Sequence, residues 1–283
     1  MANGILKIAT CQFPVSENIR RNSEYICGFI NDAKTRDADI VHFSEAGLSG
    51  YAGMDFESFE GYDWQLLTEE TKKIMALAAK LKIWVALGSS HKLTPPNKPH
   101  NCIYLINPNG QIEDRYDKRF GTEGDLIHYT PGNRFVIFDL NGVKCALLIC
   151  FDLRFPEIYR ALNKLKVQFV IQSFYNARQK EQSVHRHIIR QTMQANCASN
   201  YFWASMSNSC GEIAPYPSCL IQPDGEIINE LKLNTTGIMV NTVDTSIPFY
   251  DPSAKFREIA IKGILTNGPQ ILNDPRSKDF KSL

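Results

Sequence analysis

The feature that most constrains the fold is a repeated alternation of short apolar runs with segments of helical spacing. Residues 39–43 read Asp-Ile-Val-His-Phe, a β-branched run typical of strands buried on both faces. Residues 68–81 place Ile74, Leu77 and Leu81 on one side of a helix. Such alternation favours an α/β domain. Strands are expected at 6–13, 39–43, 83–89, 102–106, 111–116, 135–140, 143–149, 167–173, 201–207, 218–222, 227–231 and 239–243, and helices at 19–33 after a Ser16 cap, at 68–81, from Pro156 and at 181–199.

Turn signals join three pairs of these strands into expected hairpins. Residues 107–110 read Asn-Pro-Asn-Gly, residues 141–142 read Asn-Gly, and residues 223–226 read Pro-Asp-Gly-Glu. Asn, Asp and Gly favour such turns because they tolerate positive backbone φ angles. No linker rich in Gly, Ser or Pro divides the chain. The sequence therefore predicts one α/β domain, with either a largely buried sheet or two sheets packed together.

Composition and charge argue against several classes of protein. The chain has 283 residues and a formal net charge of +1, which gives no reason to expect nucleic acid or an acidic membrane as a partner. No apolar run is long enough to span a bilayer, and the first residues lack the pattern of a secretory signal. We therefore expect a cytoplasmic protein with a small-molecule ligand, whose eight cysteines are reduced.

Three polar residues stand where an α/β fold places its chemistry. Cys150 follows the apolar run 143–149 and precedes an expected helix, so its thiol would lie at the carboxyl end of a strand and near a helix N-terminus. Glu45 also ends a buried strand, just before a turn that contains glycine. Lys118 lies in the highly charged stretch 113–120. In one pocket the carboxylate could take the proton of the thiol, and the ammonium could hold an oxyanion.

Each of these residues also has an ordinary interpretation. A free cysteine is often a small buried core residue, and Cys150 taken alone fits that interpretation equally well. A glutamate at the end of a strand is often a solvated cap, and most of a charged stretch is surface. The three positions gain weight only when they are taken together.

In this order the three segments resemble the carbon–nitrogen hydrolase family, also called the nitrilase superfamily. Residues 44–51 read Ser-Glu-Ala-Gly-Leu-Ser-Gly-Tyr, residues 117–120 read Asp-Lys-Arg-Phe, and residues 150–157 read Cys-Phe-Asp-Leu-Arg-Phe-Pro-Glu. The resemblance implies an α-β-β-α sandwich, assigned here to residues 1–250. Residues 251–283 are then a C-terminal extension that packs on the domain or on a partner subunit.

The resemblance also implies how the site would work. Glu45, Lys118 and Cys150 would be catalytic, with no metal or organic cofactor. The backbone N–H of Phe151 would help Lys118 to hold the oxyanion. Subunits of this family usually pair through helices, so a homodimer or a higher homo-oligomer is expected.

The stretch between the lysine and the cysteine matches the family less well. Members usually carry a second glutamate shortly before a Pro-Gly, and here both Glu123 and Asp125 precede Pro131-Gly132. Glu123 is the expected second acid, because it has the same side chain, although the spacing of Asp125 is also found. Residues 119–121 read Arg-Phe-Gly, where a histidine often follows the lysine, so the shape of the loop on the substrate side is left open.

The residues after the nucleophile point to the substrate class. Phe151-Asp152 is similar to the amide-hydrolysing members rather than the nitrilases. Residues 150–155, Cys-Phe-Asp-Leu-Arg-Phe, most resemble the ω-amidase-like branch, which acts on terminal amides of short α-keto acids. Enzymes that hydrolyse N-carbamoyl amines or amino acids are the alternative. The expected substrate-binding residues are Tyr51, Arg154, Asn176 and Arg178, although either arginine could equally belong to a surface ion pair.

Other functions also have to be weighed. His185 and His187 near Cys197 could suggest a metal site, but two histidines two positions apart on a helix face different directions. A papain-like Cys–His pair has no local motif to support it. Two alternative hypotheses remain. The chain could be a nitrilase, or it could be a binding protein that has this fold but no catalytic activity.

Overall fold

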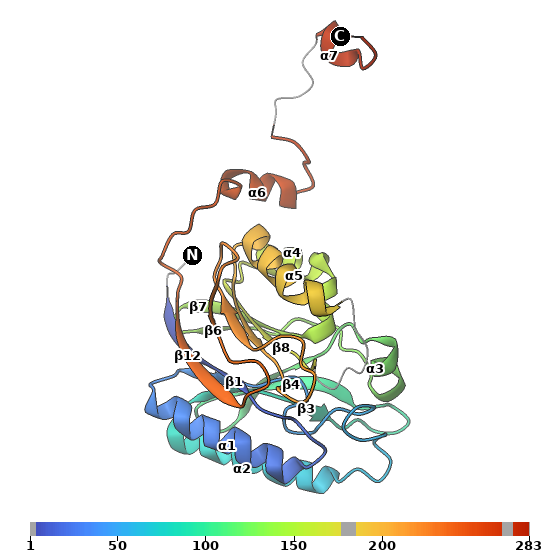
Figure 1. Ribbon diagram of the computed structural model, residues 1–283, viewed down its shortest axis with the longest axis vertical. Coiled ribbons are helices and arrows are strands. Elements are labelled where there is room, and N and C mark those ends of the chain that lie inside the picture. The colour runs from blue at the N-terminus through green and yellow to red at the C-terminus, as the bar shows by residue number, and fades with distance from the viewer. Residues whose placement is uncertain (1–3, 177–184, 268–273, 283) are drawn as a thin grey trace. The chain divides into compact units, whose positions relative to one another are not determined.

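The computed structural model describes residues 4–176, 185–267 and 274–282. Its contacts divide the chain into two compact units, residues 1–249 and residues 250–283. The first unit holds two six-stranded sheets. Figure 1 shows helices α1 (Ile19–Thr35) and α2 (Trp64–Leu81) along the outer side of one sheet, and α4 (Pro156–Lys164) and α5 (His185–Asn200) along the outer side of the other. The predicted α-β-β-α sandwich is confirmed.

The first sheet has the strand order β12-β1-β2-β3-β4-β5. Strands β1, β2 and β3 run parallel, β12 pairs antiparallel with β1, and β4 and β5 extend the other edge as antiparallel strands. The hairpin predicted at residues 107–110 joins β4 to β5. The bounds are β1 (Ile5–Gln12), β2 (Ile40–His42), β3 (Trp84–His91), β4 (His100–Ile106), β5 (Ile112–Asp117) and β12 (Gly237–Asp244).

The second sheet repeats this plan. Its order is β11-β10-β9-β8-β7-β6, with β7, β8 and β9 parallel in the centre and an antiparallel hairpin at each edge. The predicted turns at residues 141–142 and 223–226 close these two hairpins. The bounds are β6 (Ile137–Leu140), β7 (Val143–Ile149), β8 (Phe169–Ser173), β9 (Trp203–Ser207), β10 (Cys219–Ile221) and β11 (Ile227–Glu230).

Burial on both faces explains why the strands read as nearly continuous apolar runs. In β1, Leu6 and Ile8 belong to the apolar cluster between the two sheets, whereas Cys11 belongs to the cluster under α1 and α2. Successive side chains of a strand point to opposite faces, so the same strand supplies two cores. A strand of this kind shows little alternation of apolar and polar residues.

The cap of one helix and the start of another differ from the prediction. The N-cap of α1 is Asn18 rather than Ser16, because the Asn18 side chain accepts a hydrogen bond from Arg21 N at 3.0 Å while Ser16 bonds to Asn22. Helix α2 begins at Trp64, about one turn before residue 68, because the Asp63 side chain accepts from Leu66 N at 2.8 Å. In α2 the polar cap therefore set the start of the helix more strongly than the apolar spacing did.

A buried histidine at the end of β2 connects the first sheet to β8 and β9 of the second sheet. His42 Nδ1 lies 2.9 Å from Ser205 Oγ, and His42 Nε2 lies 3.1 Å from Ser173 Oγ. Burial lowers the pKa of His42 to about 3, so the ring is neutral at physiological pH. Ser173 Oγ also donates to Phe43 O at 2.7 Å. The segments that follow β2 and β8 are therefore held against each other.

The second unit contains α6 (Ala254–Ile261) and the short α7 (Pro275–Lys278). Arg257 pairs with Asp251 at the start of this unit. The unit begins one residue before the expected extension, and how it packs stays a prediction. All eight cysteines are free. Within the described ranges, no helix combines the length and the apolar character needed to cross a bilayer.

Candidate active site

The ends of four strands converge on one pocket of about 350 Å³. Lys118 follows β5, Cys150 follows β7 and Asn176 comes three residues after β8, and all three line this pocket. Glu45, three residues after β2, lies behind Lys118 and is fully buried. The pocket wall is otherwise mainly apolar, with Met54, Phe151, Leu153 and Ile189 among its residues.

Glu45 is held in place by three hydrogen-bond donors. Asn101 Nδ2 and Lys118 Nζ donate to Glu45 Oε1 at 2.8 and 2.7 Å, and Tyr175 N donates to Glu45 Oε2 at 2.9 Å. The backbone N–H of Glu45 donates to Phe174 O at 3.2 Å. Burial raises the pKa of Glu45, and the positive charge of Lys118 opposes this shift only in part. A carboxyl of this kind can accept a proton closer to neutral pH than an exposed glutamate can.

Lys118 stands between two carboxylates. Its Nζ lies 2.7 Å from Glu45 Oε1 and 2.8 Å from Asp125 Oδ2, and the side chain is almost fully buried. Its backbone is also fixed, by Asn101 O at 2.9 Å and Gly132 N at 2.8 Å. Burial opposes the charge of the ammonium, but Glu45, Cys150 and Asp125 hold the pKa of Lys118 well above its usual range. Lys118 is therefore a fixed cation.

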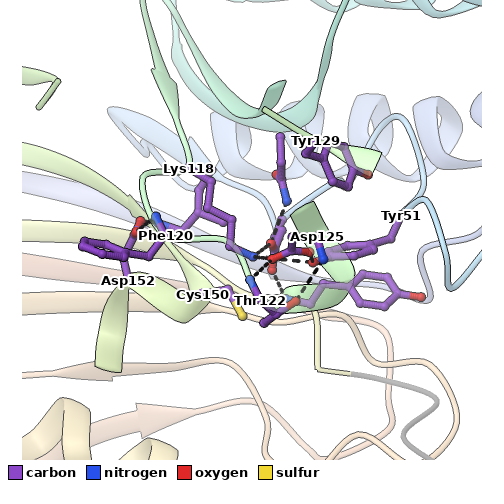
Figure 2. A network of polar contacts seen from close by, with 12 residues as sticks. Tyr51, Lys118, Phe120, Thr122, Asp125, Tyr129, Cys150 and Asp152 are labelled. Carbon is purple, nitrogen blue, oxygen red and sulfur yellow. Dashed lines mark hydrogen bonds and ion pairs between the residues drawn. The ribbon is translucent and has the colours of Figure 1, made fainter. Parts of the chain in front are cut away.

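The second acid beside Lys118 is Asp125 and not Glu123. Asp125 Oδ2 accepts from Lys118 Nζ and, at 2.9 Å, from Thr122 N, while Asp125 Oδ1 accepts from the Tyr51 hydroxyl (Figure 2). Burial opposes the charge of Asp125, but Lys118 and these donors lower its pKa. Glu123, expected at this place, is exposed on the first turn of α3 (Glu123–His128).

The reason for this difference is the start of a helix that the sequence did not reveal. Thr122 and Asp125 form a capping box, in which Thr122 Oγ1 accepts from Asp125 N at 3.1 Å. The third residue after such a cap turns back toward the helix start, whereas Glu123 as the first helical residue turns outward. The pattern Thr-x-x-Asp at residues 122–125 is the signal that could have identified Asp125.

Cys150 lies on a tight turn at the end of β7. It begins the 3₁₀ helix η1 (Cys150–Arg154), and its backbone φ is +40°, a value that few residues with side chains adopt. The thiol is partly buried, and Asn176 Nδ2 lies 3.6 Å from Cys150 Sγ. Burial and the charge of Glu45 raise the pKa of Cys150 well above its usual range, while Lys118 acts in the opposite direction. The thiol therefore holds its proton until a base removes it.

Asn176 is fixed by residues from the segment between β9 and β10. Its Nδ2 donates to the Tyr216 hydroxyl at 2.6 Å, and its backbone N donates to Asn208 Oδ1 at 2.9 Å. Asn208 Nδ2 in turn donates to Tyr216 O at 2.9 Å. The sequence contains no local signal for Asn208, Tyr216 or Asn101, because each acts on a residue far away along the chain.

The other predicted residues lie as follows. Tyr51, Phe151 and Arg154 line the pocket, with Arg154 exposed. Arg178 lies outside the described residues, as does the side chain of His185. His187 is exposed and Cys197 is buried. In the described part of the chain, no three His, Cys, Asp or Glu side chains are grouped so that they could hold a metal ion.

Comparison with known proteins decides the family. The profile of the carbon–nitrogen hydrolase family matches residues 7–248. The chain belongs to this family. The family profile ends close to Phe249, where the first unit of the structure ends.

Several relatives of this carbon–nitrogen hydrolase are known. A hydrolase in the agr operon of Staphylococcus lugdunensis is 29% identical over 245 residues, which cover 76% of this chain and 95% of that protein. The omega-amidase of Homo sapiens is 27% identical over 161 residues, which cover 54% of this chain and 57% of the human protein. A solved amidase of the nitrilase superfamily, from Nesterenkonia, matches with a TM-score of 0.75 at 19% identity, over 90% of this chain and 93% of the solved one. At that identity the solved structure shows the shared fold alone.

Proposed function

We propose that this chain hydrolyses a carbon–nitrogen amide bond of a small molecule through a thioester on Cys150. The observation that carries the proposal is the array at the pocket, in which Lys118 lies 2.7 Å from Glu45 and 2.8 Å from Asp125 while Cys150 lines the same pocket. A relative supports the cysteine as the nucleophile. A solved variant of the Nesterenkonia amidase shows covalent addition of the acetamide moiety of fluoroacetamide at the active-site cysteine of that protein.

In the first half of the reaction, Glu45 removes the proton of the Cys150 thiol as the sulfur attacks the carbonyl carbon. The carbonyl oxygen gains the negative charge, which the Lys118 ammonium and the backbone N–H of Phe151 stabilise. Glu45 then gives its proton to the leaving nitrogen. The carbon–nitrogen bond breaks, ammonia or an amine departs, and the acyl group remains on the sulfur.

In the second half, Glu45 takes a proton from a water molecule that attacks the thioester carbon. The carbon–sulfur bond breaks, the acid leaves, and the proton returns to the thiol. Glu45 therefore acts as base, acid and base again, which suits a carboxyl with a raised pKa. Asp125 keeps Lys118 charged and oriented, the role for which Glu123 was expected.

The preferred substrate in this proposal is the terminal amide of a short acid. Two relatives carry such names, the omega-amidase of Homo sapiens and the 2-oxoglutaramate amidase of Bacillus subtilis, each 27% identical over little more than half of this chain. Arg154 lines the pocket, and in this proposal its guanidinium binds the carboxylate at the far end of such a substrate. An N-carbamoyl compound is the alternative substrate.

A panel of ω-amides, N-carbamoyl amines and aliphatic nitriles, assayed for release of ammonia, tests the proposal. We expect release from ω-amides that stops in Cys150→Ala. If only the N-carbamoyl compounds release ammonia, the substrate belongs to the alternative class. Release from nitriles alone, or turnover by Cys150→Ala at the parent rate, would contradict the proposal. A cytoplasmic location and a homo-oligomeric state remain predictions.

A further inference from the structure

Asp152 is a buried carboxyl that the reaction described above does not use. It lies two residues after Cys150 in η1 and is 0% exposed, so it is shielded from the pocket. A buried acid without a direct chemical task requires an explanation, because burial disfavours its charge. Its hydrogen bonds supply one.

The carboxylate of Asp152 connects the two sheets at the site. Its Oδ2 accepts from Ile149 N at 3.0 Å, within the turn that carries Cys150. The same Oδ2 accepts from the Tyr116 hydroxyl at 2.7 Å. Oδ1 accepts from Phe120 N at 3.0 Å (Figure 2). Tyr116 belongs to β5 of the first sheet, and Phe120 comes two residues after Lys118.

A second contact joins the same two segments. The ring of Phe120 stacks on Phe155, with centroids 3.8 Å apart and planes inclined by 23°. Phe155 N donates to Asp152 O at 3.2 Å. The segment after the lysine is therefore attached to the segment after the cysteine through both its backbone and its side chain.

We propose that Asp152 is a positioning residue that sets the separation between the Cys150 thiol and the Lys118 ammonium. The proposal rests on the proposed function, because the separation matters for catalysis only if Lys118 stabilises an oxyanion formed at the sulfur. Lys118 is anchored in the first sheet and Cys150 in the second, and Asp152 is bonded to both segments. A change in this separation weakens the stabilisation of the transition state more than the binding of the substrate.

The substitution that tests this proposal most directly is Asp152→Asn, because the amide has nearly the same size as the carboxyl and changes only the hydrogen bonding. With its oxygen toward Ile149 N and the Tyr116 hydroxyl, the amide turns its NH₂ toward Phe120 N, where two donors face each other. The bond to Phe120 N, on the side of Lys118 away from β5, is lost, while the two bonds at Oδ2, from Ile149 N and the Tyr116 hydroxyl, are kept. The control is Ile26→Ala, on the buried face of α1, because it opens a cavity in the core away from the site.

The readout is the rate at which iodoacetamide alkylates Cys150 at pH 8, measured on the peptide that contains Cys150. Moving the ammonium away raises the pKa of the thiol, so we expect Asp152→Asn to react about 10-fold more slowly, as one pKa unit requires. A turn that is merely loosened exposes the sulfur and reacts faster. In turnover of an ω-amide, kcat should fall about 10- to 100-fold with little change in KM.

An alkylation rate in Asp152→Asn equal to or above that of the parent overturns the proposal, as does a matching decrease in Ile26→Ala. If Asp152→Asn does not fold, Phe155→Leu, which removes the stacking on Phe120, should also react more slowly, and a parent rate in that variant overturns the proposal. Alkylation needs no substrate. Slower alkylation in a protein that hydrolyses none of the test compounds would therefore support the positioning role while the proposed function fails.

Discussion

The Lys118 ammonium lies 2.8 Å from the Asp125 carboxylate, in a pair that is almost completely buried. The exposed Glu123 lies two residues away on the same short helix. This contrast offers a matched pair of substitutions, each of which exchanges a carboxylate for an amide. The two should differ greatly in effect, although their positions are nearly adjacent.

Asp125→Asn should lower kcat/KM by about 100-fold or more, because Lys118 loses one of the two charges that hold it. Glu123→Gln should stay within about twofold of the parent, since a surface substitution has a small effect. Steady-state release of ammonia measures both. Equal losses in the two variants would show that the pair at Lys118 has no special part in the reaction.

Replacement of Cys150 should separate the chemistry from the fold. Cys150→Ala should reduce turnover at least about 10⁴-fold, as loss of a nucleophile does, while the melting temperature stays close to that of the parent. Cys150→Ser should be nearly as inactive. A surviving rate above one tenth of the parent rate in Cys150→Ala would require another nucleophile.

The acid side of the pH–rate profile should report on the carboxyl of Glu45. Glu45 must be ionised to take the thiol proton, and burial raises its pKa, so kcat/KM should fall on acidification above the usual glutamate value of about 4.3. Asn101 donates to the ionised carboxylate, so Asn101→Ala should move this fall to higher pH. If Asn101→Ala leaves the pH of this fall unchanged, or moves it to lower pH, the assignment of Glu45 as the base is contradicted.

His42 should remain neutral throughout the physiological range. Its pKa is about 3 in the folded chain and about 6.5 in an unfolded one, so between these values the unfolded state binds the additional proton. Its contribution to stability is therefore complete above about pH 6.5 and is lost as the pH falls, by up to about 1.4 kcal/mol per pH unit. Ring NMR signals of His42 that titrate near pH 6.5 would refute this.

Much of the fold could be predicted from the sequence, because its signals are local. The turn residues at 107–110 and 141–142 close hairpins whose strands are neighbours along the chain. The apolar run before Cys150 forms β7 because burial on both faces requires such a run. Glu45 and Cys150 were candidates because each follows an apolar run, and Lys118 because it lies in a charged stretch, but the resemblance of the three segments to the family singled them out.

Other features depended on contacts between distant segments. Asn101 and Tyr175 bind the Glu45 carboxylate from positions 56 and 130 residues away, and no local pattern marks them. The choice of Asp125 over Glu123 is different, because it depended on the local capping box of Thr122 and Asp125, a signal that the prediction did not use. Local spacing predicts which segments become strands and turns, since those preferences act over a few residues. Which side chains meet in the pocket is settled only by tertiary packing. The first sheet brings Glu45, Asn101 and Lys118 together from separate strands, and its packing on the second sheet adds Cys150 and the backbone N–H of Tyr175.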